Sequence, residues 1–220
     1  MKLLSTSVLD IANNLSGASR VFHYFGIDLC EHSDKRLEEL SQAQNINQAD
    51  LLEEFNTLPK PPDLQLAPWK KLSTAKFIDK LLAEFHYRHR KHLPEIIRLS
   101  RHLDKHLKHP ALPRHLSHKL INFQEDLEQH MIAEEQELFP MLKSAPVADI
   151  KTHLSAMHFK HREHDRAMQS LETMTGQLCT PSGVNCATLQ VLYSELGRFL
   201  NELRTHMVLE DEILYQRITQ

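Results

Sequence analysis

Two segments of the chain, 120–139 and 196–215, repeat the same order of apolar and polar side chains at the same spacing, 76 positions apart. The matched positions are Leu120, Phe123, Leu127, His130, Met131, Glu134, Leu138 and Phe139 in the first segment, and Leu196, Phe199, Leu203, His206, Met207, Glu210, Leu214 and Tyr215 in the second. The intervals of three and four residues predict one buried face of an α-helix in each segment. On that face each segment carries a histidine and, four residues later, a glutamate. The chain must therefore bury an imidazole and a carboxylate twice within a helical core.

The rest of the sequence favours helices as well. Five glycines in 220 residues and a hydrophobic content of 41% are typical of an all-α globular protein. We predict four long helices, joined by short polar loops, over 73–107, 114–143, 147–177 and 186–218. Helices of matched length with short connections indicate an antiparallel four-helix bundle. The clustered prolines of PKPPDLQLAP interrupt helical structure. The predicted organisation is therefore a small helical N-terminal domain (1–58), a linker (59–71) and the bundle (72–220).

Charge and cysteine content exclude several classes of partner and location. A formal net charge of −3 gives no reason to expect nucleic acid as a partner. No apolar run is long enough to span a membrane, and the N-terminus lacks the apolar core of a signal peptide. Three cysteines, at positions 30, 179 and 186, do not form the even framework of a disulfide-rich secreted protein. A cytoplasmic location is expected.

The buried histidines and glutamates predict a metal site. Buried polar groups without partners cost several kcal/mol each, a cost that metal coordination offsets. A single His-x3-Glu is usually a solvated pair on a helix surface, but two copies in register on core faces favour metal binding. Periodicity leaves the remaining ligands open, because His86 and His89 share the core face of the first long helix, and His161 and His164 share that of the third. His86 precedes His130 by 44 positions and His164 precedes His206 by 42, which suggests a symmetric site with two metals bridged by both glutamates. Nitrogen and oxygen ligands without thiolate favour iron.

Four stretches carry a resemblance to a known family: FHYRHRKHLPEII (85–97), HMIAEEQELFPML (130–142), EHDRAM (163–168) and HMVLEDEILY (206–215). They are similar to the hemerythrin-like cation-binding four-helix bundle and, within it, to the RIC (repair of iron centres) proteins. The resemblance implies two iron ions in an oxo- and carboxylate-bridged di-iron centre. The ligands it implies are His86, His130, Glu134, His164, His206 and Glu210. It leaves His89 and His161 as polar core residues beside the site.

The resemblance also implies a function, namely the repair or protection of iron–sulfur clusters damaged by nitrosative or oxidative stress. Damaged iron–sulfur proteins and small ligands such as nitric oxide or oxygen are then the expected partners, and the separate N-terminal domain is compatible with a homodimer. One alternative is an enzyme that reduces nitric oxide at the di-iron site. Another is a hemerythrin-like protein that binds or senses oxygen or nitric oxide. Because oxygen carriers generally use five histidines and two carboxylates, a set of four and two argues against simple carriage. Whether the chain is an enzyme is left open.

The chain departs from the family at one position of the N-terminal domain, and two charged residues follow the repeated glutamates. The family has two adjacent cysteines in its N-terminal domain, whereas Cys30 is followed by Glu31, so no local disulfide can form. Glu135 and Asp211, which directly follow the two glutamates of the repeat, are expected to be exposed charges.

Overall fold

The structure, a computed structural model, describes residues 3–15, 17–58, 66–110, 112–144, 147–181 and 183–219. Within these ranges the side chains of residues 30, 144, 147–149 and 218–219 are not described. The predicted function of Cys30 and the segment 59–65 of the predicted linker therefore fall outside the described parts. The ordered elements in these ranges are helices, and none forms a strand, which confirms the all-α prediction. No helix among them is long and apolar enough to cross a membrane.

The N-terminal part of the chain consists of short helices, as the sequence predicts. They are η1 (Leu3–Ser5), α1 (Val8–Asn14), α2 (Ala18–Tyr24), α3 (Leu29–His32), α4 (Leu37–Ala43) and α5 (Gln48–Asn56). Side-chain caps begin two of them: Ser7 Oγ accepts from the N–H of Asp10, and Asn47 Oδ1 accepts from the N–H of Ala49. Helices this short are not stable alone, so they depend on packing.

These helices belong to a compact unit that also contains later parts of the chain. The unit comprises Met1–Pro61, Pro94–Ser117 and Leu178–Arg198. Polar contacts join its segments: the N–H of Gly17 donates to Glu195, and the Arg98 guanidinium donates to the carbonyl of Ser19. The N-terminal helices therefore belong to one compact unit with the ends of some long helices. The division of the chain into 1–58, 59–71 and 72–220 stays a prediction.

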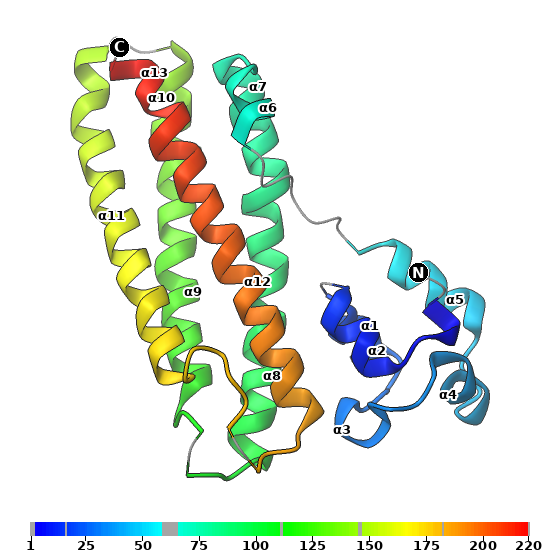
Figure 1. Cartoon of the computed structure of the whole chain (residues 1–220). Helices are drawn as coiled ribbons and strands as arrows, with labels where there is room; N and C mark the ends of the chain where they lie inside the picture. Colours follow the sequence, from blue (N-terminus) through cyan, green and yellow to red (C-terminus); the bar gives the residue numbers. More distant parts are fainter. Residues whose placement is uncertain are drawn as a thin grey trace. The chain divides into compact units, whose positions relative to one another are not determined.

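The second compact unit comprises Pro62–Leu93, His118–Gln177 and Phe199–Gln220. The helices that contribute to it are α6 (Leu66–Lys70), α7 (Thr74–Leu81), η2 (Leu82–His86), α8 (Tyr87–His106), α9 (Leu116–Ala133), η3 (Glu134–Leu138), α10 (Phe139–Ser144), α11 (Val147–Met174), α12 (Ala187–Leu209), η4 (Glu210–Leu214) and α13 (Gln216–Thr219). The four longest are α8, α9, α11 and α12 (Figure 1). They match the four predicted helices, so the predicted four-helix bundle is confirmed.

Ion pairs within this unit fix which long helices are neighbours. Arg88 of α8 pairs with Glu202 of α12 at 2.8 Å. Arg204 of α12 pairs with Glu172 of α11, also at 2.8 Å. In a third contact, Arg90 of α8 donates to the carboxylate of Glu128 in α9 at 2.9 Å. Each pair ties one helix to the next around the bundle.

An apolar cluster closes one end of the second unit. It contains Trp69, the only tryptophan, which is fully buried and packs edge-on against Phe77 at 5.0 Å between ring centroids. Phe85, Phe139 and Tyr215 belong to the same cluster. Phe85 directly precedes His86 in the sequence, and Phe139 and Tyr215 follow Glu134 and Glu210 by five residues. The apolar core and the polar site therefore adjoin each other.

Candidate metal centre

Three π-helical turns occur in the described part of the second unit, and each contains a predicted ligand. η2 ends at His86, η3 begins at Glu134, and η4 begins at Glu210. In each turn a backbone N–H donates to the carbonyl five residues earlier, as from Tyr215 to Glu210 at 2.8 Å. Such one-turn π-bulges are rare and frequently mark functional sites. Nothing in the residue types predicts them.

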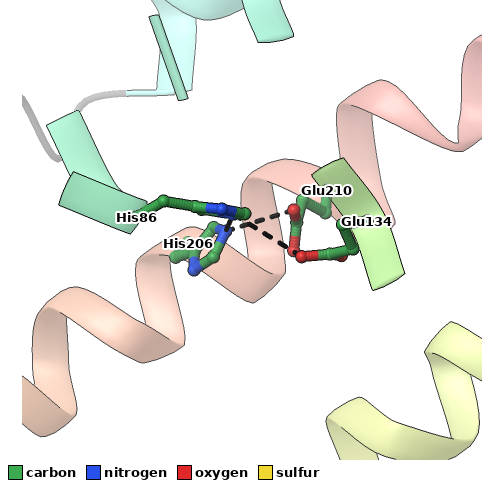
Figure 2. Close-up of side chains that lie close together, drawn as sticks. All are labelled: His86, Glu134, His206 and Glu210. Carbon is green, nitrogen blue, oxygen red and sulfur yellow. Dashed lines mark hydrogen bonds and ion pairs between the residues drawn. The ribbon is translucent and has the colours of Figure 1, made fainter. Parts of the chain in front are cut away.

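One group of ligand atoms contains two imidazoles and two carboxylates from η2, η3, α12 and η4 (Figure 2). Its members are His86, Glu134, His206 and Glu210, all of them buried. The Nε2 atoms of His86 and His206 lie 3.1 Å apart, and His206 Nε2 lies 3.1 Å from Glu210 Oε1. His86 Nε2 is 3.5 Å from Glu134 Oε2. One atom from each residue lies within 4.8 Å of all the others, a spacing that suits a single cation.

A second group repeats this arrangement with the other helices. Its members are His130, Glu134, His161 and Glu210, again all buried. The Nε2 atoms of His130 and His161 are 3.2 Å apart. Glu134 Oε1 lies 3.4 Å from His130 Nε2, and Glu210 Oε2 lies 3.3 Å from His161 Nε2. The two groups therefore share both glutamates, and each glutamate faces them with different oxygens.

The structure brings five of the six predicted ligands into these groups and puts His161 where His164 was expected. His161 Nε2 faces both the imidazole of His130 and the carboxylate of Glu210, whereas His164 belongs to neither group. The ring of His164 packs edge-on against His130 at 4.9 Å and Phe123 at 5.9 Å. We therefore correct the sixth candidate to His161. The two residues are three positions apart on one helix face, so helical periodicity alone does not separate them.

A signal for His161 was present in the repeat itself. The interval from His161 to His206 is 45 positions, closer to the 44 between His86 and His130 than the 42 from His164. The same offset of three residues relates His86 to His89. His89 is buried and lies outside both groups, with its ring 5.3 Å from that of His206.

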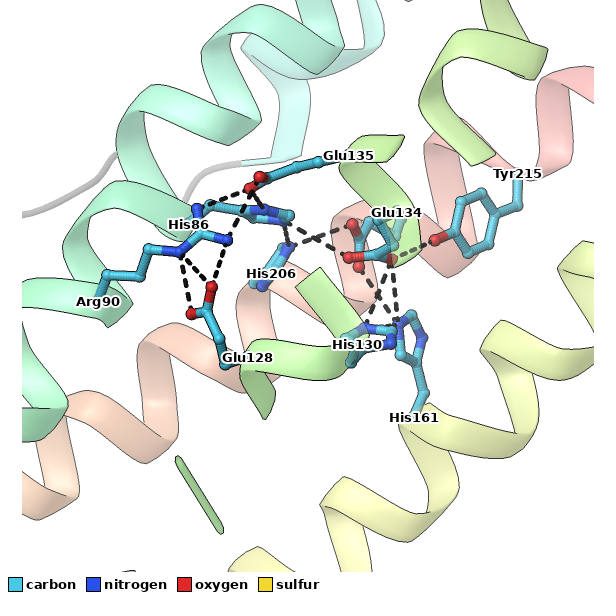
Figure 3. Close-up of polar contacts among 10 residues, drawn as sticks. His86, Arg90, Glu128, His130, Glu134, Glu135, His161, His206 and Tyr215 are labelled. Atoms are coloured by element: carbon cyan, nitrogen blue, oxygen red, sulfur yellow. Dashed lines mark hydrogen bonds and ion pairs between the residues drawn. The ribbon is translucent and has the colours of Figure 1, made fainter. Parts of the chain in front are cut away.

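The sequence does not predict that two carboxylates, Glu135 (labelled in Figure 3) and Asp211, lie behind the imidazoles. Glu135 Oε1 lies 2.7 Å from Nδ1 of His86, and Asp211 Oδ1 lies 2.9 Å from Nδ1 of His161. Both carboxylates are half-buried rather than exposed, because a histidine from a neighbouring helix reaches each of them. A hydrogen bond that Nδ1–H donates to a carboxylate fixes the tautomer that leaves Nε2 free to coordinate. These two residues orient the imidazoles.

Glu135 belongs to a larger network. The guanidinium of Arg90 donates to Glu135 at 2.7 Å and to Glu128 at 2.9 Å (Figure 3). The hydrogen bonds from His86 and Arg90 lower the pKa of Glu135 to about 2. This carboxylate is therefore charged at neutral pH and held in place on two sides.

The unsatisfied groups of the site fit a bound cation. Glu134 Oε2 and Glu210 Oε2 are buried and accept no hydrogen bond, although each is close to an imidazole. Pairs of Nε2 atoms, which cannot all donate to one another, converge at 3.1 and 3.2 Å. Buried carboxylates and imidazoles in this arrangement are costly without a cation between them. The residues present fit a metal site.

Burial and neighbouring charges shift the pKa values of the ligands in this site. Burial and the charge of Glu210 hold the pKa of Glu134 well above its usual range. Burial alone would lower the pKa of His161, but the hydrogen bond to Asp211 and the charge of Glu210 raise it to about 10. At neutral pH His161 is therefore protonated in the metal-free protein, and a cation must displace this proton.

We accordingly expect metal loading to release about one proton per chain at pH 7, because coordination requires a deprotonated His161. Affinity should fall as the pH is lowered, since protons compete with the cation. Anaerobic titration with ferrous ion in weak buffer containing a pH indicator measures the release. In the variant Asp211→Asn one of the groups that raise the pKa of His161 is neutral, so the proton release should be smaller. Equal release by both proteins would contradict this assignment.

Comparison with known proteins agrees with the fold and the site. Residues 78–218 match the model of the hemerythrin HHE cation-binding domain. A protein of Haemophilus influenzae named "Probable iron-sulfur cluster repair protein" is 29% identical over 99% of this chain and 98% of its own length. Proteins named "Iron-sulfur cluster repair protein YtfE" from Edwardsiella ictaluri and Escherichia coli are 25% and 26% identical, each over 94% of both chains. The fold and the buried histidines and glutamates define a cation-binding helical bundle. The chain belongs to the hemerythrin HHE cation-binding family.

Proposed function

We propose that the chain binds two iron ions and uses them to repair or protect iron–sulfur clusters damaged by nitrosative or oxidative stress. The observation that carries the two-ion proposal is the pair of buried ligand groups that share Glu134 and Glu210. The proposed ligands are His86, His130, Glu134, His161, His206 and Glu210. The names of the relatives, which align with nearly the whole chain, support the repair function. A cytoplasmic location belongs to the same proposal, on the grounds of cysteine usage.

The chemistry of the ligands supports iron. The groups contain imidazole nitrogen and carboxylate oxygen and no thiolate. Structural zinc sites are four-coordinate and often rich in cysteine, and calcium and magnesium prefer oxygen alone. Two shared carboxylates with two imidazoles at each end suit iron or manganese. Among these, iron fits a protein that acts on iron–sulfur clusters.

The protein's own residues provide three things to such a centre. Glu134 and Glu210 hold the two positions at a fixed separation, while Glu135 and Asp211 keep Nε2 of the adjacent imidazoles directed inward. Aromatic rings exclude water: that of Phe85 stacks on His206 at 5.4 Å between centroids. The bound iron would supply either redox chemistry or ions for a damaged cluster.

The direct test of this function is reactivation. Full-length protein loaded anaerobically with iron should restore activity to an iron–sulfur dehydratase that nitric oxide has inactivated, and the metal-free protein should not. Iron analysis and Mössbauer spectroscopy should find two iron ions per chain in the loaded protein. Loaded protein that fails to reactivate the enzyme, or that holds two zinc ions after expression with ample iron, would contradict the proposal.

The reduction of nitric oxide to nitrous oxide is a second candidate, favoured by the closeness of the two groups. Single-turnover assay of nitrous oxide from the iron-loaded protein separates this enzymatic function from repair. The variant Cys30→Ser belongs in both assays, because position 31 carries glutamate and one thiol alone is available there. We expect unchanged iron content in this variant, since none of the proposed ligands lies in the first 61 residues.

A further inference from the structure

The site is nearly symmetric, and its two halves can be compared residue by residue. Corresponding residues are His86 and His161, His206 and His130, Glu134 and Glu210, Glu135 and Asp211, and Phe139 and Tyr215. We call the half with His86 and His206 the first half, and the half with His130 and His161 the second half. Equivalent distances agree closely: the paired Nε2 atoms are 3.1 Å apart in the first half and 3.2 Å apart in the second.

The last of these pairs breaks the symmetry. Tyr215 is 1% exposed, and its hydroxyl donates to Glu134 Oε1 at 2.7 Å (Figure 3). Phe139 occupies the equivalent position and is also buried, with its ring 5.8 Å from that of His86. A phenyl ring has no hydroxyl, so Phe139 cannot donate to Glu210 as Tyr215 does to Glu134.

The hydrogen bond falls on the oxygen that faces the second half. Glu134 Oε1 lies 3.4 Å from His130 Nε2 and 3.9 Å from His161 Nε2. The other oxygen, Oε2, faces His86 at 3.5 Å and accepts no hydrogen bond. A hydroxyl that donates to a carboxylate oxygen stabilises the negative charge there and makes this oxygen a weaker donor to a cation.

The side chains that hold the two orienting carboxylates, Glu135 and Asp211, also differ between the two halves. In the first half Glu135 is fixed by Arg90, whose guanidinium also binds Glu128. In the second half Asp211 contacts His158 at 2.9 Å, and this imidazole is 42% exposed. A planar guanidinium shared by two carboxylates restricts motion more than a single surface imidazole does. His161 is therefore held less firmly than His86.

We propose that Tyr215 is a positioning residue that makes the two halves unequal, so that the second half releases its ion first while the first half retains its own. This inference rests on the proposed function, since it requires two bound ions. It assigns one ion of the pair to donation. The ion in the first half would then keep the remaining ligands in place after the other has left.

The test follows the release of iron from the full-length, ferrous-loaded protein to excess chelator by stopped-flow absorbance. The natural protein should lose its iron in two phases of equal amplitude. Tyr215→Phe should slow the faster phase by about 10-fold, the size expected for one buried hydrogen bond to a charged group. The matched change Phe139→Tyr, which adds a hydroxyl to the first half, should accelerate the slower phase.

A second measurement locates the retained ion. Anomalous diffraction from protein depleted of one equivalent should place it between His86 and His206. The inference is overturned, without affecting the proposed function, if both ions are lost at a single rate. It is also overturned if Tyr215→Phe leaves the fast phase unchanged, or if the retained ion lies in the second half. A single ion per chain in fully loaded protein would instead overturn the proposed two-iron function. If Tyr215→Phe does not fold, the phases of the natural protein and of Phe139→Tyr still decide between these outcomes.

Discussion

Replacing either shared glutamate with glutamine should remove at least one of the two ions, because each carboxylate contributes an oxygen to both ligand groups. We expect the affinity of Glu134→Gln and Glu210→Gln for iron to fall by about 100-fold or more. Loss of a residue that only hydrogen-bonds to a metal ligand already lowers affinity by about 10- to 100-fold. The metal-free variants should remain folded, since glutamine has nearly the same shape and removes a buried charge. Iron analysis after gel filtration and circular dichroism measure the two effects.

Glu137→Gln is the matched control for these variants. Glu137 lies in the same π-helical turn as Glu134 but its side chain is exposed, so this change should leave two ions bound. Full iron content in Glu134→Gln or Glu210→Gln would show that the carboxylates do not bridge. Loss of iron in all three variants would indicate a general effect on η3 and η4 rather than lost ligands.

Replacing His161 with alanine should empty the second half of the site, whereas His164→Ala should retain two ions. Of these two imidazoles, that of His161 has Nε2 at 3.3 Å from Glu210 Oε2 and Nδ1 at 2.9 Å from Asp211 Oδ1, whereas His164 belongs to neither group. The loss of one of three or four ligands is expected to lower affinity by at least 10-fold. Iron content and the Mössbauer spectrum of each variant give the answer.

The equivalent pair in the first helix provides an internal check. His86→Ala should lose iron, and His89→Ala should retain it, because His89 lies outside both groups. An empty site in His164→Ala combined with a full site in His161→Ala would restore the ligand that the family resemblance implied. It would also show that the third helix turns when metal binds.

The repeated segments carry enough information to predict the bundle and most of the site. Apolar residues at intervals of three and four, interrupted by His130, Glu134, His206 and Glu210, identify both the buried face and the groups that need compensation. No comparable repeat exists for the first and third long helices. There the choice between residues three positions apart depends on the rotation of each helix, which depends on packing against its neighbours.

The orienting carboxylates illustrate a different limit. Glu135 and Asp211 each directly follow a glutamate of the buried helix face, and successive residues of an α-helix point about 100° apart. The pattern of one helix therefore predicts that both are exposed. Their function arises from histidines on a neighbouring helix, a contact between distant parts of the chain that periodicity within one segment does not describe.

The π-helical turns at His86, Glu134 and Glu210 have a consequence for the redesign of this fold. Each turn accommodates one residue more than a regular helix would, so its backbone is less favourable than the α-helix on either side. Removing one residue from such a turn would restore regular geometry and rotate the rest of the helix by about 100°. Variants of this kind would gain backbone stability and misplace the ligands. The three turns are therefore local departures from regular helix geometry that place the ligands, and a design that optimised the helices alone would eliminate them.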